Sequence, residues 1–311
     1  MSTLLEFKHV TGNSRKFALH NIDFSMEKGY IMGLAGRNGA GKTTALRIIL
    51  GMLNSEGGTV TWKDRAFSPF KTDVGYLPEE RGLYPKYTVM DQLLYFAKLK
   101  NISKSDAKKE IIYWAERIGV EEYIFPKKTK KNKTKYYTAE QLSKGNQQKI
   151  QLMIALLGNP ELLILDEPLS GLDPVNSDLF KSIIREEIDK GKYLIMSSHQ
   201  MPVIEEFCED ITILNKGKTI LQGNLNEIKK GYGRVNLILR CEGDISPYIE
   251  EYNFDLVNKT PLEYHIKVEG EEIATKFLSR LIDEKVPVIK FELREPSLHE
   301  IFIEKVGTED E

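Results

Sequence analysis

A glycine-rich segment near the N-terminus constrains the fold of this 311-residue chain more than any other feature. It reads Gly36-Arg-Asn-Gly-Ala-Gly-Lys-Thr, follows the apolar stretch Ile31–Ala35 and precedes residues with a helical pattern. Glycines let the backbone curl until its N–H groups point at one place, and the N-terminus of the next helix favours anions. The segment therefore predicts a strand, a phosphate-binding loop and a helix within an α/β domain.

The loop also predicts which residues hold a nucleotide. Lys42 is expected to reach the β- and γ-phosphates of ATP, and the Thr43 hydroxyl to ligate Mg²⁺. Other phosphate contacts are expected from Gly36, Asn38, Gly39, Ala40, Gly41 and Thr44. ATP and Mg²⁺ are the expected cofactors.

Two acids follow the buried apolar run of residues 162–165. Asp166, at the predicted strand tip, can hold magnesium through water, and Glu167 can polarise a water for attack on the γ-phosphorus. Paired acids at a strand end are often only a polar terminus. Together with the phosphate loop they predict an ATPase in which Glu167 and Lys42 are catalytic.

The order of apolar and helical stretches predicts two domains. Through residues 1–230 strands alternate with helices, as in a mostly parallel sheet covered by helices. Residues 88–157 have a helical pattern and predict an inserted helical subdomain. We place the boundary at Gly231-Tyr-Gly, because glycines interrupt the pattern there. Residues 234–306 predict a small α+β domain, for which a ferredoxin-like order is one option.

Composition limits the classes of partner that this chain can bind. Hydrophobic residues make up 41% and charged residues 29% of the chain, which permits a substantial core. The formal net charge of -2 argues against whole-molecule attraction to nucleic acid, so none is expected. Cys208 and Cys241 have neither disulfide-framework nor metal-ligand spacing, which favours a reducing cytosol. No apolar run approaches the ~20 residues of a membrane helix, so another chain must supply any membrane span.

A dense run of positive charge lies within the predicted helical subdomain. Two interpretations stay open, a solvated mobile loop and a contact surface for anionic phospholipid. The lysines are Lys127, Lys128, Lys130, Lys131, Lys133 and Lys135.

The segment Leu142-Ser-Lys-Gly-Asn resembles the signature sequence of ATP-binding cassette (ABC) proteins. Lys144 and Asn146 stand where the family usually has glycine and glutamine. Ser143 and Gly145 keep the positions that face a γ-phosphate in the family. An Ser-x-Gly before a helix is independently a reasonable anion site, since a hydroxyl and free N–H groups converge there.

Further segments resemble the family in its order. Ser170-Gly-Leu-Asp is similar to the loop that crosses the dimer interface, and His199 matches the histidine that contacts the γ-phosphate. Glu79 stands where the family usually has a glutamine for magnesium and water, and a carboxylate also suits that metal. Phe17 is the one aromatic candidate for stacking on adenine, although a core role is the alternative.

The resemblance implies a P-loop ABC cassette acting as the motor of a transporter. It implies a head-to-tail dimer, with an identical or a different second subunit, in which Ser143 and Gly145 complete the site of the partner. It also implies an integral membrane permease docked near residues 81–87, and a position at the cytoplasmic face of the cell membrane. The C-terminal segment beginning Glu295-Pro-Ser-Leu-His is similar to the accessory domain of bacterial sodium, peptide or antibiotic exporters, which implies export.

Two other classes of function are alternatives to a transporter motor. A soluble ABC ATPase with a regulatory or partner-binding C-terminal domain is the main alternative. A P-loop GTPase is disfavoured, because Lys218 stands where the acid of the guanine-reading motif would be. The sequence does not identify a transported substrate.

Overall fold

The computed structural model describes residues 5–14, 17–26, 31–68, 72–80, 82–125, 127–128 and 134–307. The chain divides into two compact units, Met1–Gln222 and Gly223–Glu311. The division comes earlier than the boundary expected at residues 230–234. Gly223 takes a positive φ of 138°, and the Asn224 side chain then accepts hydrogen bonds from the backbone N–H groups of Asn226 and Glu227. Asn224 thereby caps helix α8 (Leu225–Tyr232), which lies within the second unit.

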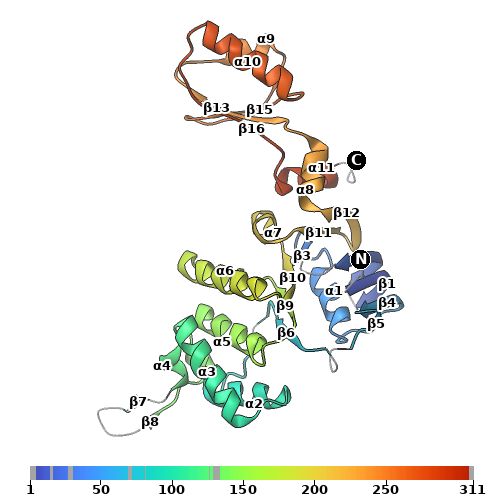
Figure 1. The fold of residues 1–311 in the computed structure, drawn as a ribbon, viewed down its shortest axis with the longest axis vertical. Coiled ribbons are helices and arrows are strands. Elements are labelled where there is room, and N and C mark those ends of the chain that lie inside the picture. The colour runs from blue at the N-terminus through green and yellow to red at the C-terminus, as the bar shows by residue number, and fades with distance from the viewer. Residues whose placement is uncertain are drawn as a thin grey trace. The chain divides into compact units, whose positions relative to one another are not determined.

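A six-stranded sheet forms the centre of the first unit (Figure 1). Its order is β12-β11-β3-β10-β9-β6, and β11, β3, β10, β9 and β6 pair in parallel. The strands are β3 (Ile31–Ala35), β6 (Val74–Leu77), β9 (Leu162–Asp166), β10 (Tyr193–Ser198), β11 (Asp210–Asn215) and β12 (Lys218–Asn224). Every residue of β3, β9 and β10 is buried, which explains their continuous apolar sequences.

A second, antiparallel sheet has the order β2-β1-β4-β5. Its strands are β1 (Leu5–Ser14), β2 (Phe17–Met26), β4 (Gly57–Trp62) and β5 (Arg65–Ala66). Residues of both sheets and of helix α1 (Lys42–Ile49) share one core, which includes Leu34, Leu46 and Trp62. The helices α6 (Pro174–Asp189) and α7 (Met201–Phe207) follow β9 and β10.

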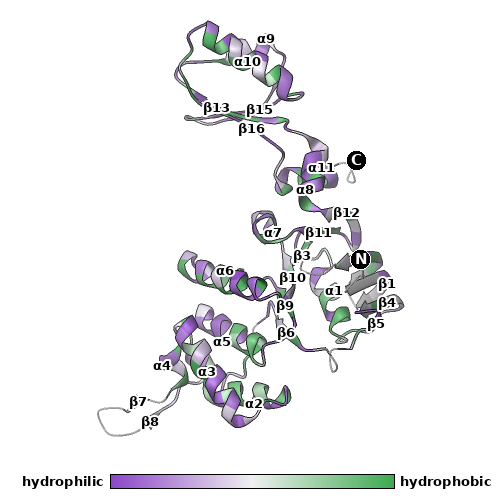
Figure 2. Cartoon of the chain, viewed as in Figure 1, coloured by the Kyte–Doolittle hydropathy of each residue, from purple (hydrophilic) through white to green (hydrophobic). Residues whose placement is uncertain are grey.

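A group of helices lies between β6 and β9 in the sequence. Its elements are α2 (Val89–Leu99), α3 (Lys104–Ile118), α4 (Glu121–Ile124), the short strands β7 (Lys127–Lys128) and β8 (Thr134–Lys135), a 3-10 turn (Ala139–Gln141) and α5 (Lys144–Leu156). Figure 2 shows hydrophobic and hydrophilic residues mixed along these helices, as expected when one face packs and the other meets solvent. The side chains of the lysine-rich run lie outside the described residues.

Lys100 links two helices of this subdomain. Its ammonium follows α2 and donates hydrogen bonds to the carbonyls of Ile154, Ala155 and Leu157 at the end of α5. Those carbonyls lack partners within their own helix, so a cation there satisfies them. Burial lowers the pKa of Lys100 to about 8.

The second unit is a small α+β domain. It contains α8 (Leu225–Tyr232), β13 (Asn236–Cys241), α9 (Ser246–Glu251), β14 (Asp255–Lys259), β15 (Tyr264–Lys267), α10 (Glu271–Asp283), β16 (Val288–Arg294) and α11 (Leu298–Gly307). The sheet order β14-β15-β13-β16 with antiparallel pairing gives the ferredoxin-like βαββαβ arrangement. Its core includes Leu239, Ile266 and Phe277.

No helix among the described parts of the chain has the length and apolar content needed to cross a membrane.

Candidate active site

Four neighbouring parallel strands end at one edge of the central sheet. The glycine-rich loop follows β3, Glu79 lies two residues beyond β6, Asp166 and Glu167 are at the end of β9, and His199 follows β10. Because β3, β10, β9 and β6 are adjacent in that order, residues far apart in sequence meet at this edge. The C-terminal ends of parallel strands are where α/β proteins place their sites.

The glycine-rich loop has a backbone that only glycine adopts easily. Gly36 and Gly41 have φ values of 152° and 108°. A Cβ atom on Gly36 would lie 2.4 Å from the carbonyl oxygen of Leu214, so a side chain there would collide with backbone. The Lys42 ammonium is buried and donates to the carbonyl of Gly36 at 2.7 Å, which folds the lysine back along its own loop.

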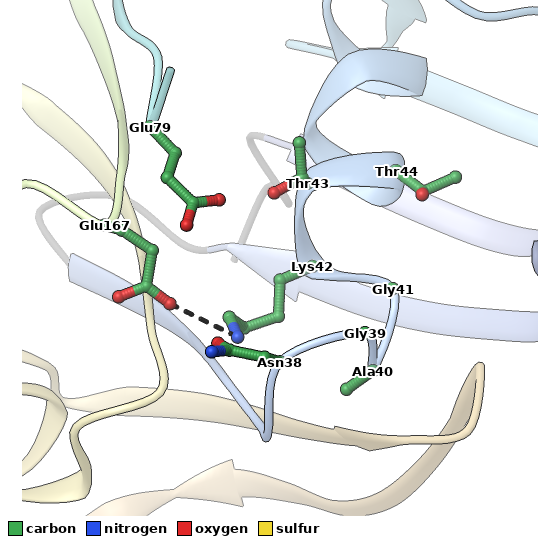
Figure 3. Close-up of a pocket in the computed structure, with 9 residues that line it drawn as sticks. All are labelled: Asn38, Gly39, Ala40, Gly41, Lys42, Thr43, Thr44, Glu79 and Glu167. Atoms are coloured by element: carbon green, nitrogen blue, oxygen red, sulfur yellow. Dashed lines mark ion pairs between the residues drawn. The ribbon is translucent and has the colours of Figure 1, made fainter. Parts of the chain in front are cut away.

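The loop encloses one side of a cavity of about 360 Å³ (Figure 3). Glu79 and Glu167 approach from the other side, each on a different strand end. The cavity thus has the glycine-rich loop and the Lys42 ammonium on one wall and carboxylates on the other, which suits a phosphate with a bound cation. Its lining comprises Asn38, Gly39, Ala40, Gly41, Lys42, Thr43, Thr44, Glu79 and Glu167.

Glu167 is held by contacts from two sides. Its Oε1 lies 3.2 Å from the Lys42 ammonium, and its Oε2 lies 2.8 Å from His199 Nδ1. The backbone N–H of Glu167 donates to the Ser197 hydroxyl at 3.1 Å. Glu167 has a positive φ of 49°, a strained conformation for a side-chain-bearing residue. Backbone strain at a residue whose carboxylate is buried and held by two partners is typical of a residue positioned for chemistry.

Asp166 is buried and lies beside Thr43. One carboxylate oxygen accepts a hydrogen bond from the Ser197 hydroxyl, whereas Oδ2 is buried without a hydrogen-bond partner among the described residues. Burial raises the pKa of Asp166, and the hydroxyls of Ser197 and Thr43 oppose that rise. An unsatisfied buried oxygen costs free energy, which a cation or its water would recover.

These residues fit magnesium held jointly with a nucleotide. No group of three or more His, Cys, Asp or Glu side chains among the described residues could hold a metal ion by itself. The Thr43 hydroxyl and the Asp166 and Glu79 carboxylates are hard oxygen donors, as magnesium requires, and phosphate oxygens complete such a set.

Glu79 is close to two other acids, Glu167 in the same cavity and Asp166 at the end of β9. Burial raises the pKa of its carboxyl, and the negative charges of Asp166 and Glu167 raise it further. An ionised Glu79 therefore adds repulsion to any anion in the cavity. A bound divalent cation would relieve this repulsion.

Ser143 and Gly145 lie outside the residues that line the cavity. Ser143 is exposed at the N-terminus of α5, and its hydroxyl accepts a hydrogen bond from Asn146 N–H at 3.3 Å. A Cβ atom on Gly145 would lie 3.5 Å from Asn176 Nδ2 in the first turn of α6. The side chain of Phe17, at the start of β2, lies outside the described residues.

Two glutamines with no role predicted from the sequence help to position the site. Gln148 and Gln151 lie on α5 and donate from their side chains to the carbonyls of Pro168 and Glu80, at 2.8 and 3.1 Å. Helix α5 thus contacts Pro168, next to Glu167, and Glu80, next to Glu79. Glutamines within a helix are common, so no spacing in the sequence signals these roles.

Models of known families match both units of the chain. The ABC transporter family matches residues 19–170. The C-terminal domain of DrrA1-3-like ATP-binding proteins matches residues 223–306. The second match starts where the structure begins its second unit.

Individual relatives extend these matches over nearly the whole chain. The uncharacterised ABC transporter ATP-binding protein YhaQ of Bacillus subtilis is 42% identical over 98% of this chain and 99% of its own length. The linearmycin resistance ATP-binding protein LnrL of the same organism is 27% identical over 94% of each chain. A solved ATP-binding subunit of an ABC transporter superposes with a TM-score of 0.63 at 25% identity, covering 74% of this chain and 93% of that one.

Proposed function

We propose that this chain, which belongs to the ABC transporter ATP-binding family, is the motor subunit of an exporter whose paired cassettes close around ATP. The chain is an ABC ATPase. One observation carries the proposal beyond that statement. The phosphate loop and Glu167 share one cavity, while Ser143, expected at the γ-phosphate, lies outside that cavity on the surface of the helical subdomain.

Hydrolysis is assigned to Glu167. Its carboxylate is buried and held by Lys42 and His199, and its backbone is strained. The carboxylate can therefore orient and polarise the attacking water without reorganising. Lys42 is proposed to exchange its Gly36 contact for β- and γ-phosphate oxygens, and His199 to stabilise charge at the γ-phosphate. Magnesium, when held by Thr43, Asp166 and Glu79, neutralises phosphate charge.

Dimer closure supplies the motion. Ser143 and Gly145 of a second subunit would complete each ATP site, so ATP holds two copies together and hydrolysis separates them. The serine hydroxyl and the N-terminus of α5 form a reasonable contact for a γ-phosphate. The sequence leaves open whether the second subunit is identical.

Export is supported by the second unit. Residues 223–306 match the DrrA1-3-like C-terminal domain, and the similarity to LnrL, a resistance protein by name, spans both units. The unit is proposed to bind a partner or to stabilise the dimer, because its sequence lacks a group of catalytic residues. The complex would sit at the cytoplasmic face of the membrane, with the substrate passing through separate permease subunits.

Loss of Glu79 charge is expected to improve the nucleotide site. Glu79→Gln removes a carboxylate next to Asp166 and Glu167 and restores the amide usual in the family. Less repulsion should lower the KM for MgATP about fivefold, the effect of ~1 kcal/mol of charge interaction at a water-like dielectric. Steady-state hydrolysis at varied MgATP measures this. The amide oxygen can still ligate magnesium, so kcat should change little. A large fall in kcat would instead mean that magnesium needs the charge of the carboxylate.

Coupling to the permease is proposed at the loop before α2, where Tyr84 and Tyr87 are 49% and 62% exposed. Tyr84→Ala should remove most of the extra ATPase activity that the co-reconstituted permease elicits, with ATP binding by the isolated chain unchanged. Tyr113→Ala is the control, since Tyr113 on α3 is similarly exposed, at 51%. Loss of ATP binding, or equal effects of the two changes, would refute the assignment of this loop to permease coupling. This experiment also tests the motor function itself.

A further inference from the structure

A second cleft lies on the helical subdomain, outside the nucleotide cavity. It has a volume of about 430 Å³, and it is lined by Tyr84, Tyr87, Asp91, Gln92 and Tyr95. These residues belong to α2 and to the loop that precedes it. We call this feature the tyrosine cleft.

Gln92 fixes the shape of the tyrosine cleft. It is buried, and its side chain accepts a hydrogen bond from Tyr84 N–H at 2.8 Å while donating to the carbonyls of Tyr84 and Tyr87, each at 3.1 Å. One amide thus clamps both ends of the tyrosine loop to α2. The cleft is therefore preformed, and a ligand would not have to order it.

Three tyrosine rings surround the cleft at steep angles to one another. The Tyr84 ring centroid lies 5.9 Å from that of Tyr87 and 6.5 Å from that of Tyr95, with interplanar angles of 69° and 80°. Each ring is about half exposed. Aromatic faces at such angles attract a cation, as in the aromatic cages that bind methylated ammonium groups. Within the described residues, no lysine or arginine lies over any of these three rings.

The charge at the cleft has the sign that a cation needs. Asp91 is exposed, and its Oδ2 accepts a hydrogen bond from the uncharged Thr88 hydroxyl at 2.6 Å. No ion pair of Asp91 occurs in the part of the chain that the structure describes. The carboxylate therefore remains available to an incoming donor.

We propose that the tyrosine cleft receives an arginine side chain from a helix of the membrane partner. This inference rests on the proposed function, and it names the chemistry that the partner brings. A planar guanidinium can stack on the tyrosine rings and donate two hydrogen bonds to Asp91, which an ammonium cannot match. The contact would fix the position of the partner helix along α2 as well as contribute affinity. An arginine that both stacks on the rings and pairs with Asp91 can occupy only one position.

The helix beyond the cleft offers a path for the rest of the partner segment. Asp91, Tyr95 and Leu99 follow one another at four-residue spacing, so they share one face of α2. All three are exposed, and Leu99 is 60% exposed although it is apolar. An amphipathic partner helix that places arginine in the cleft would bring an apolar residue to Leu99.

Photo-crosslinking identifies the occupant directly. The full chain, with a photoreactive phenylalanine analogue at position 87, is expressed in its own cells and the crosslinked peptide is sequenced by mass spectrometry. We expect a cytoplasmic segment of a polytopic membrane protein that contains an arginine. The same analogue at position 113 serves as a control and should not capture that segment.

The outcomes separate this inference from the proposed function. A membrane-protein segment without arginine would refute the inference and leave the coupling assignment standing. Capture of a soluble protein, capture of a second copy of this chain, or no crosslink would refute both.

Charge reversal then tests the role of Asp91. Asp91→Lys should lower the crosslink yield about tenfold, the effect of ~1.4 kcal/mol of lost attraction, and changing the partner arginine to glutamate should restore it. The matched control is Asp106→Lys. Asp106 has the same place in the first turn of α3, where it accepts a hydrogen bond from Ser103 at 2.7 Å, but no tyrosine cleft adjoins it. Equal losses in both variants would show that helix capping explains the effect.

Discussion

Glu167→Gln is expected to abolish turnover while ATP stays bound. The amide keeps the size of the side chain but cannot accept a proton or polarise water as a carboxylate does. General-base catalysis contributes about 10²–10⁴-fold, so kcat should fall by that factor. ATP binding should persist, since the phosphate contacts come from the loop and not from Glu167, and ATP-bound dimers should accumulate. Single-turnover hydrolysis and size-exclusion chromatography with ATP measure the two effects.

A matched control lies at the other end of the same strand. Glu161 immediately precedes β9 and forms an exposed ion pair with Lys63. Glu161→Gln removes a carboxylate from a surface pair worth little, so turnover should not change. Sustained hydrolysis by Glu167→Gln would mean that another residue is the base.

Ser143→Arg is expected to stop hydrolysis although Ser143 does not line the cavity of its own chain. A bulky cation at the start of α5 would block the close approach of that helix to a γ-phosphate in a second subunit. Loss of such a contact costs about 10²–10³-fold in kcat by comparison with other preorganised donors. ATP should still bind to the separate chain, which a filter-binding or fluorescence assay can measure.

Ser103→Arg separates this effect from loss of a helix cap. Ser103 caps α3 as Ser143 caps α5, each hydroxyl accepting a hydrogen bond from a backbone N–H three residues on. Both changes should cost about 1 kcal/mol of stability. Only the change at Ser143 should stop hydrolysis. Equal inactivation by both would point to misfolding of the helical subdomain.

Much of the fold was predictable because its signals are local. The glycine-rich loop requires a strand before it and a helix after it, and both occur where the sequence places them. The buried run before Asp166 could only be a central strand. The ferredoxin-like second unit follows from an alternation of strands and helices that repeats over short distances.

The features that could not be predicted from the sequence depend on contacts between residues that are far apart in the chain. The contacts of Gln148 and Gln151 with the loops after β9 and β6 arise only when α5 packs against the sheet. The hydrogen bond of Ser197 to Asp166 links two strands that are separate in sequence. The glycines near the end of α8 are conspicuous in the sequence, whereas Gly223, where the second compact unit begins, lies within a strand pattern.

The central claim is that each ATP site is shared between two chains, and mixing two inactive variants tests it directly. Lys42→Ala destroys the phosphate site of one chain, and Ser143→Arg destroys the contribution of the other. In a mixed dimer, one of the two sites then combines the intact phosphate loop of the Ser143→Arg chain with the intact Ser143 of the Lys42→Ala chain. With random pairing half of the dimers are mixed, so roughly a quarter of wild-type ATPase activity should return. No recovery, with mixed dimers shown to form, would contradict the shared site and place all its residues on a single chain.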